Sequence, residues 1–166
     1  VDTIKNTYEE IYGNKIKANV QHAIEFFLEK IRSEELKLTQ PIEKTISYHD
    51  PCLLSRRDNN IRLVDQAREI LDQIPKLTVK DPYLHGDETR CCGMGGAYAV
   101  SNTKYSEKLQ EERLQQLKKH SPDIILSACP TCEYAFQKAQ ERSKDYDQTI
   151  LDIIELLAQA VGLKYR

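Results

Sequence analysis

Residues 123–132, DIILSACPTC, run from an apolar segment directly into a CxxC motif. The four residues 123–126 predict a short buried strand, and the residues after Cys132 predict a helix that extends to about residue 142. A strand that leads into a helix through Cys129 and Cys132 places both thiols at the carboxyl end of that strand. This stretch indicates an α/β fold with chemistry at one edge of the sheet.

Outside this stretch, β-rich segments alternate with helical ones. Alternation of this kind implies right-handed crossovers and an open, mostly parallel sheet with helices on both faces, as in Rossmann-like folds. The other predicted strands are 45–48 and 77–79, and the other predicted helices are 61–74 and 105–120. The run 106–119 is densely charged, and its alternating signs favour an exposed helix. One face of the helix at 61–74 carries Ile61, Val64, Ala67, Ile70, Leu71 and Ile74.

The predicted fold gathers all the cysteines of the chain. Loops that leave the carboxyl ends of parallel strands converge along one edge of the sheet. Cys52 follows the first strand, Cys91 and Cys92 lie in the loop after the second, and Cys129 and Cys132 follow the third. We therefore expect all five thiols to face one crevice.

Length and composition limit the roles that so many cysteines can have. The chain has 166 residues, which suffices for one hydrophobic core without disulfides. Its 24 basic and 26 acidic residues are scattered and give a net charge of −2, so we do not expect a nucleic-acid surface. No apolar run is long enough to cross a bilayer. These features predict a cytoplasmic protein in a reducing compartment, where cysteines bind metals or act in catalysis more often than they form bridges.

The residues alone leave two chemistries open. Soft thiolates brought together from several loops are typical of a metal centre. A CxxC between a strand and a helix is also the arrangement of thioredoxin-like dithiols, in which the helix N-terminus lowers the pKa of the first thiol. For Cys129 and Cys132 taken alone the two interpretations have equal weight, and the other three cysteines favour a metal.

The two ends of the chain suggest an internal repeat. Residues 24–28, IEFFL, resemble residues 154–158, IELLA, and both lie in amphipathic segments. The match suggests that residues 1–38 are a helical segment at the tail of an earlier copy, whose own CxxC would precede Val1. Residues 39–166 would then form the cysteine-rich domain of a longer, duplicated protein.

The motifs around the cysteines resemble the cysteine-rich CCG domain of iron-sulfur oxidoreductases. This domain occurs in heterodisulfide reductase, in glycolate oxidase, in anaerobic glycerol-3-phosphate dehydrogenase and in lactate-utilisation proteins. The resemblance extends from about residue 46 to residue 157 and rests on residues 48–52 (YHDPC), 91–96 (CCGMGG) and 129–132 (CPTC). The chain departs from the family where it has Leu53 in place of histidine and Ala97 in place of a further glycine.

The resemblance implies a non-cubane [4Fe-4S] cluster. A structural zinc or a cubane cluster takes four cysteines, whereas a cluster of two fused halves can use five. The implied ligands are Cys52, Cys91, Cys92, Cys129 and Cys132. The residues expected to support them are His49, Arg56, Gly93, Gly95, Gly96 and Pro130.

Several of these supporting residues have a second interpretation. His49 can donate to a thiolate, relay a proton or simply close the strand. Arg56 matches an arginine of the family motif and can hold an anionic substrate or stabilise the charge of the cluster. The glycines would let backbone N–H groups approach the cluster, or would only reverse the chain.

The resemblance also implies a function and partners. We expect electron transfer, and reduction of thiols or disulfides, in a larger oxidoreductase whose other subunits or domains carry ferredoxin-type clusters or flavin. The small molecules implied are disulfides, thiols or members of a 2-hydroxy acid pathway, and any membrane association would come through partner subunits. The isolated domain is not expected to be an active enzyme, and preparation in air can leave its site empty. A zinc-binding structural module and a metal-free CxxC dithiol switch remain the alternatives.

Overall fold

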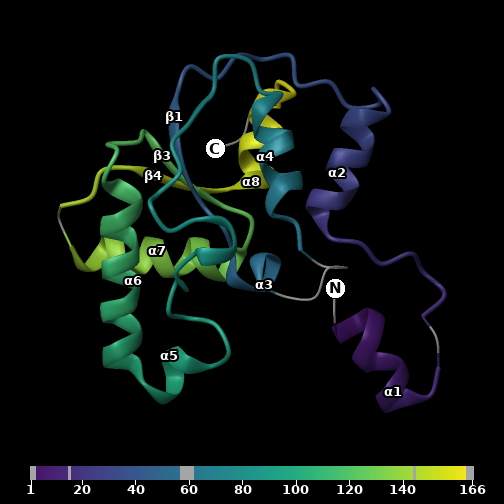
Figure 1. Ribbon diagram of the computed structural model, residues 1–166, viewed down its shortest axis with the longest axis horizontal. Coiled ribbons are helices and arrows are strands. Elements are labelled where there is room, and N and C mark those ends of the chain that lie inside the picture. The colour runs from purple at the N-terminus through teal and green to yellow at the C-terminus, as the bar shows by residue number, and fades with distance from the viewer. Residues whose placement is uncertain (1–2, 15, 57–61, 144, 164–166) are drawn as a thin grey trace.

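The computed structural model describes residues 3–14, 16–56, 62–143 and 145–163, and Figure 1 shows the path of the chain. The elements in chain order are η1 (Thr3–Thr7, a turn of π-helix), α1 (Tyr8–Tyr12), α2 (Ala23–Arg32), β1 (Thr45–His49), α3 (Cys52–Ser55), α4 (Val64–Asp72), β2 (Thr78–Val79), η2 (Gly86–Glu88, a 3-10 turn), α5 (Tyr98–Ser101), α6 (Thr103–Lys118), β3 (Ile124–Ser127), α7 (Pro130–Arg142), β4 (Thr149–Asp152) and α8 (Ile153–Ala160).

The four strands form one parallel sheet in the order β2-β1-β3-β4. From β1 the chain moves outward to β2, then returns past β1 to build β3 and β4 on the other side. This reversal places the crossover helices on opposite faces of the sheet. The predicted open parallel α/β fold is confirmed. The fourth strand, β4, was not predicted.

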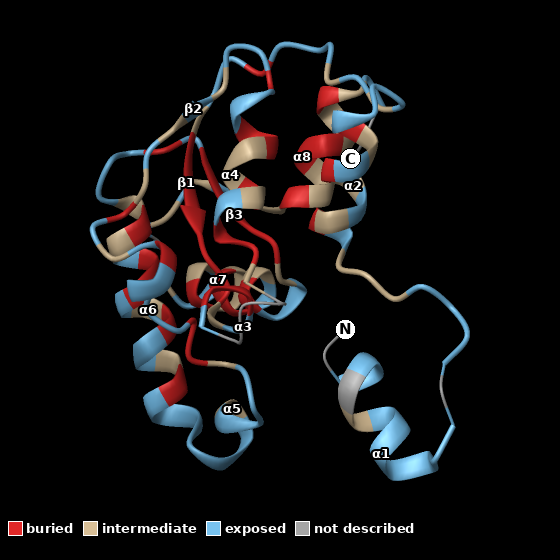
Figure 2. Ribbon diagram, turned by 45° about the vertical axis from the view of Figure 1, so that its right-hand side comes forward, coloured by how far each residue is buried: buried red, intermediate tan, exposed pale blue. Residues whose placement is uncertain are grey.

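The central strand β3 separates two hydrophobic cores, because neighbouring residues of a strand point to opposite faces. Ile124 and Leu126 belong to the larger core, which also contains residues of α2, α4 and α8. Ile125 belongs to the smaller core with residues of α6 and α7. Figure 2 shows the buried strands between the helices. Burial on both faces explains why residues 124–126 are uniformly apolar rather than alternating.

The helices lie close to the predicted positions. The predicted helix 61–74 corresponds to α4, and the predicted helix 105–120 corresponds to α6. Ile61 lies outside the described residues. The other apolar positions predicted for the face of α4 are buried: Val64, Ala67, Ile70, Leu71 and Ile74.

The N-terminal segment is only partly joined to the sheet. Helix α2 contributes Ile24, Leu28 and Ile31 to the larger core. Figures 1 and 2 both show α1 standing apart from the sheet and its helices. Val1 lies outside the described residues. The boundary between residues 38 and 39, and the earlier copy it implies, stay predictions, but α2 packs with the same core as the cysteine-rich part.

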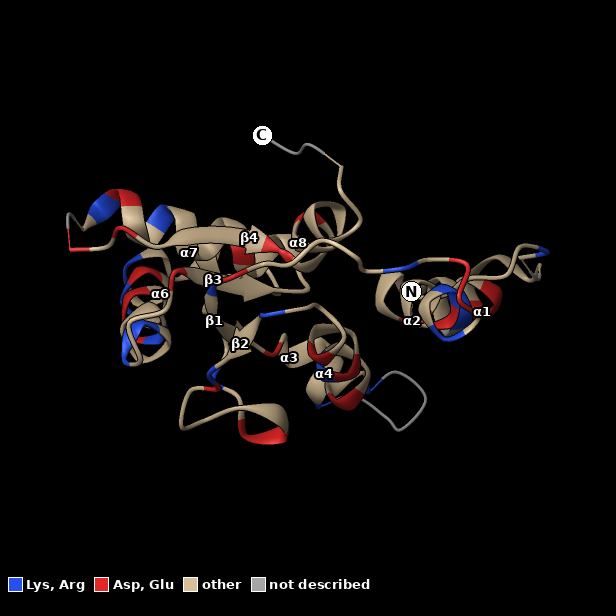
Figure 3. Cartoon of the chain, turned by 90° about the horizontal axis from the view of Figure 1, so that it is seen from above, with Lys and Arg blue, Asp and Glu red and all other residues tan. Residues whose placement is uncertain are grey.

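Basic and acidic residues are interspersed, as Figure 3 shows on α6 and α7. None of the helices in the described ranges combines the length and apolar character needed to cross a bilayer.

Candidate metal centre

The carboxyl ends of three strands are level with one another. The register pairs His49 of β1 with Ser127 of β3, and Ser127 with Asp152 of β4. The chain leaves β1 toward Cys52 and leaves β3 toward Cys129. These two loops therefore start side by side at the carboxyl edge of the sheet.

The loop after β2 reaches the same edge by following β1. The backbone N–H of Gly86 donates to Oδ2 of Asp50 at 2.7 Å, and the hydroxyl of Thr89 donates to the carbonyl oxygen of Asp50 at 3.0 Å. Thr89 immediately precedes the segment that carries Cys91 and Cys92. The vicinal cysteines are thus anchored beside the end of β1, as the fold predicts.

All five thiols are free and lie in a row. Interactions between neighbouring thiols, which shift their pKa values, connect Cys52 with Cys91, Cys91 with Cys92, Cys92 with Cys132, and Cys132 with Cys129. Cys92 and Cys132 are buried, whereas Cys91 is exposed. Among the described residues, no three His, Cys, Asp or Glu side chains are grouped closely enough to hold a single metal ion. The structure therefore brings the five sulfurs together as a chain of neighbours.

The contacts divide the thiols into two kinds. Hydrogen bonds from Cys52 and Cys92 and from the N–H of Gly93 lower the pKa of Cys91. The hydrogen bond from Cys132 lowers the pKa of Cys129 to about 6. The pKa values of Cys52 and Cys132 are raised, first by the same hydrogen bonds and then by burial. The hydrogen bond from Cys132 lowers the pKa of Cys92. The hydrogen bond to Cys91 and burial have the opposite, larger effect, so the pKa of Cys92 is raised to about 11.

The glycine-rich loop is docked on α6. Gly93 has φ +83°, and a Cβ built there would lie 2.7 Å from Cβ of Leu109 and 3.0 Å from the carbonyl oxygen of Ser106. The hydroxyl of Ser106 donates to the carbonyl oxygen of Gly93 at 2.8 Å. The N–H of Gly93 donates to Sγ of Cys91 at 3.3 Å. Gly93 is therefore required both for a close approach to the helix and for a left-handed turn.

The other two glycines of the loop are less restricted. A Cβ at Gly95 or Gly96 would meet no atom within 4 Å, but Gly96 has φ +65°. Ala97, where the family commonly has glycine, has φ +62°. A left-handed alanine carries a conformational cost of about 1 kcal/mol or more. The departure from the family pattern thus falls on a position whose backbone favours glycine.

The CxxC motif opens α7. Cys129 occupies the N-cap position with an extended backbone, and Pro130 begins the helix, where a missing N–H is tolerated. Backbone N–H groups of Thr131 and Cys132 contribute to the lowered pKa of Cys129. The helix N-terminus thus stabilises negative charge on this sulfur.

His49 and Arg113 form a buried pair behind the thiols. His49 has no exposed surface, and Nε of Arg113 donates to its Nδ1 at 3.2 Å. The His49 ring packs edge-on against Phe136, and its Nε2 is buried without a hydrogen-bond partner among the described residues. Burial lowers the pKa of His49 well below its ordinary value, and the charge of Arg113 acts in the same direction. The imidazole is therefore neutral at pH 7.

Arg113 was missed by the sequence analysis, which predicts an exposed helix at 105–120. Its guanidinium also donates to Oγ1 of Thr89 at 3.2 Å and to Oε1 of Gln116 at 2.9 Å. Burial lowers its pKa to about 10, so it stays charged at pH 7. The buried polar residues Ser106, Gln110 and Arg113 recur at helical spacing on one face of α6, which is the signal that could have revealed this face.

A second network fixes the residues just before Cys52. Arg68 of α4 makes two hydrogen bonds to Asp50, at 2.7 and 2.9 Å, and also pairs with Asp81 at 2.9 Å. Arg56, at the end of α3, donates to the backbone carbonyl oxygens of Asp87 and Thr89. These bonds tie the Cys52 loop to the segment that leads to Cys91.

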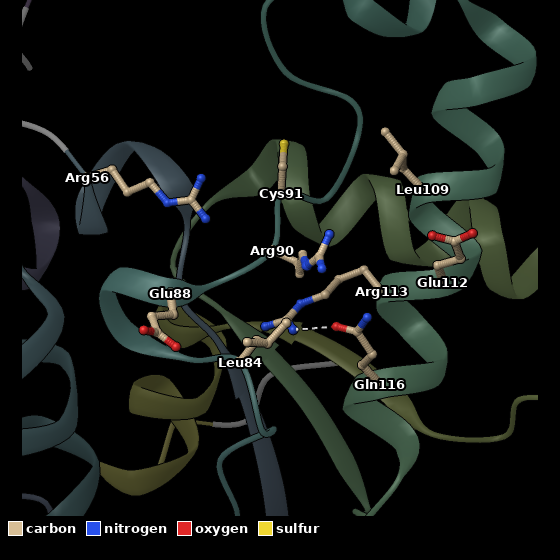
Figure 4. A pocket seen from close by; sticks show the side chains of 9 residues that line it. All are labelled: Arg56, Leu84, Glu88, Arg90, Cys91, Leu109, Glu112, Arg113 and Gln116. Carbon is tan, nitrogen blue, oxygen red and sulfur yellow. Dashed lines mark hydrogen bonds between the residues drawn. The ribbon is translucent and has the colours of Figure 1, made fainter.

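A cavity of about 560 Å³ opens beside the exposed thiol of Cys91, as Figure 4 shows. Its charged lining comprises three arginines and two glutamates: Arg56, Arg90, Arg113, Glu88 and Glu112. Of the five cysteines, Cys91 lines this cavity.

Comparisons with known proteins agree with the motifs. The family model described as a cysteine-rich domain, CCG, matches residues 46–137, which include all five cysteines. The chain is 31% identical over 159 residues to a subunit of the dihydromethanophenazine:CoB–CoM heterodisulfide reductase of Methanosarcina barkeri, covering 96% of this chain and 38% of the relative. It is 29% identical to a subunit of the CoM/CoB fumarate reductase of Methanothermobacter marburgensis, covering 95% of this chain and 30% of that protein.

A relative from Bacillus subtilis shows a similar likeness. The "probable iron-sulfur-binding oxidoreductase FadF" of Bacillus subtilis is 29% identical, covering 95% of this chain and 22% of that protein. The chain thus spans less than two fifths of the length of each of these three relatives. Since the family model matches more than half of its residues, the chain belongs to the family of CCG cysteine-rich domains.

Proposed function

We propose that the chain is the iron-sulfur cluster-binding domain of a larger oxidoreductase. Its ligands would be Cys52, Cys91, Cys92, Cys129 and Cys132, and the cluster a non-cubane [4Fe-4S] centre. The observation that carries the proposal is the continuous row of five thiols contributed by three loops. A single zinc ion takes four ligands, whereas a polynuclear centre can use every sulfur in such a row.

The surroundings of the row fit a negatively charged group. The backbone N–H groups of Gly93 and Met94 donate to the sulfurs of Cys91 and Cys92, and the N-terminus of α7 supports Cys129. Arg113 adds a permanent positive charge nearby, and Nε2 of His49 is a buried polar atom that lacks a partner among the described residues. Hydrogen bonds and charges of this kind set the potential of iron-sulfur centres.

When bound, the cluster supplies one-electron chemistry, and the protein supplies position, hydrogen bonds and access. The cavity beside Cys91 would admit a small disulfide or thiol to the exposed sulfur of Cys91, or the acceptor of a 2-hydroxy acid pathway. Electrons would come from ferredoxin-type clusters or flavin on other subunits or domains. The names of the relatives support this assignment, because they include heterodisulfide reductase and fumarate reductase subunits.

The proposal is tested by analysing protein that has been purified without oxygen. Iron and acid-labile sulfide are measured per chain, and an EPR spectrum is recorded after oxidation. Several irons with matching sulfide support the cluster. One zinc per chain would support a structural metal module instead, and thiols that oxidise in pairs without any metal would support a dithiol switch.

The ligand roles are tested by single substitutions in the vicinal pair. Cys91→Ser and Cys92→Ser should each lower the iron content, because serine is a poor substitute for a soft thiolate ligand. Met94→Leu is the matched control, since it conserves volume in the same loop and removes no ligand of the proposed set. Unchanged iron in both serine variants would refute the ligand roles.

A further inference from the structure

Arg113 is an interior cation whose hydrogen-bond partners are all neutral. Its side chain is 1% exposed and donates to His49, Thr89 and Gln116. Within the described part of the chain it forms no ion pair. A buried charge without a counter-charge is costly, so such arginines usually have an anionic partner.

The carboxylate that acts most strongly on Arg113, that of Asp50, is already engaged. Both oxygens of Asp50 accept from Arg68, and one of them also accepts from the N–H of Gly86. Asp50 therefore acts on Arg113 through its field but not through a direct hydrogen bond. Glu88 and Glu112 line the same cavity as Arg113 but form no ion pair with it among the described residues, so Arg113 has no direct counter-charge there.

Two of the thiols also interact with this pair, whereas the like charge of Arg90 opposes that of Arg113. Cys132 acts electrostatically on Arg113, and Cys91 acts on His49. The hydrogen bond from Arg113 makes Nδ1 of His49 the acceptor, so in the neutral ring Nε2 carries the hydrogen. That N–H is buried and unpaired among the described residues, and it is a donor suited to a sulfur acceptor.

We propose that Arg113 is a positioning residue of the thiolate centre: it supplies the buried positive charge that compensates the centre, and it holds His49 with its Nε2–H free to donate. This inference rests on the proposed cluster-binding function. A buried positive charge favours the reduced, more negative state of a centre, so Arg113 should raise its reduction potential.

The charge of Arg113 is separated from its structural role by three variants. Arg113→Gln removes the charge and keeps a polar group, whereas Arg113→Lys keeps the charge. Gln116→Glu places a carboxylate on the existing 2.9 Å contact with the guanidinium, without changing the shape of the side chain. This isosteric change tests the inference even where substitution of a buried arginine prevents folding.

The matched control is Gln115→Glu, which makes the same change in net charge at the neighbouring, exposed position of α6. Each protein is purified without oxygen, its iron content is measured, and its midpoint potential is determined by an EPR-monitored redox titration. We expect Arg113→Gln and Gln116→Glu each to lower the midpoint potential. The equilibrium constant for reduction should fall at least tenfold, which corresponds to about 59 mV for one electron. In Arg113→Lys and in Gln115→Glu, the equilibrium constant for reduction should stay within about threefold of that of the parent protein.

If the parent protein binds iron, three outcomes would overturn this inference and leave the proposed function standing. They are an unchanged potential in Gln116→Glu, an equal shift in Gln115→Glu and Gln116→Glu, or a fall in Arg113→Lys as large as in Arg113→Gln. A parent protein that binds no iron would overturn the proposed function and this inference together.

Discussion

The glycine at position 93 provides the sharpest test of how the cysteine loop is held. In Gly93→Ala the new methyl group would stand 2.7 Å from Cβ of Leu109 and 3.0 Å from the carbonyl oxygen of Ser106. Overpacking of this kind costs about 1–3 kcal/mol, and the left-handed backbone at φ +83° adds about 1–2 kcal/mol for alanine. We therefore expect the free energy of unfolding to fall by about 2–5 kcal/mol.

The same loop contains its own controls. Gly95 has open space around its Cα and no positive φ, so Gly95→Ala should stay within about 0.5 kcal/mol of the parent protein. Gly96 has open space but a φ of +65°, so Gly96→Ala should lose about 1 kcal/mol, the backbone cost alone. The assay is urea unfolding of the reduced, metal-free protein, followed by far-UV circular dichroism. A loss in Gly93→Ala no larger than in Gly95→Ala would show that the loop is not docked on α6 as described.

Three further predictions concern other parts of the site. Ala97→Gly should raise the free energy of unfolding by about 1 kcal/mol, because it relieves an alanine at φ +62°; no gain by urea unfolding would contradict this. In the reduced, metal-free protein, alkylation of Cys129 by iodoacetamide should be half-maximal near its pKa of about 6, since the thiolate reacts and persists above that pH; a midpoint near the ordinary thiol pKa of about 8.5, read by peptide mass spectrometry, would show that the thiol is not activated. Asp50→Asn should lower the free energy of unfolding by about 3 kcal/mol, because Arg68 would then bond to a neutral amide in place of a buried carboxylate. Asp81→Asn removes the more exposed partner of Arg68, so it should lower the free energy of unfolding by less in the same assay.

Strand position and cysteine placement could be predicted because both follow from local rules. Apolar runs such as residues 124–126 are buried on both faces of the sheet, and the chain emerges from such strands at one edge. The gathering of the five thiols therefore required only the correct order of strands and helices. Their role as ligands stays a prediction, because it depends on a group that the chain itself does not contain.

The strand β4 was missed for a local reason. It lies at the edge of the sheet, and Ile150 is its one buried residue among polar or half-buried neighbours. An edge strand has only one paired side, so its sequence needs less apolar character than a central one. Asp152, the last residue of β4, also caps α8, so a helix signal starts where the strand ends and obscures the boundary.

The polar face of α6 was missed for a deeper reason. Sequence analysis assigns a charged helix to the surface because burial of Ser106, Gln110 and Arg113 would normally be unfavourable. Here each of these side chains is hydrogen-bonded, and the face they form supports the Gly93 loop and the ring of His49. A buried cation is compatible with a stable core when a negative group compensates its charge. In the proposed function that negative group is the thiolate centre. Residues that complement a bound group can therefore look misplaced in the sequence, so an unpaired interior arginine beside clustered thiols is itself a pointer to the kind of ligand that the fold receives.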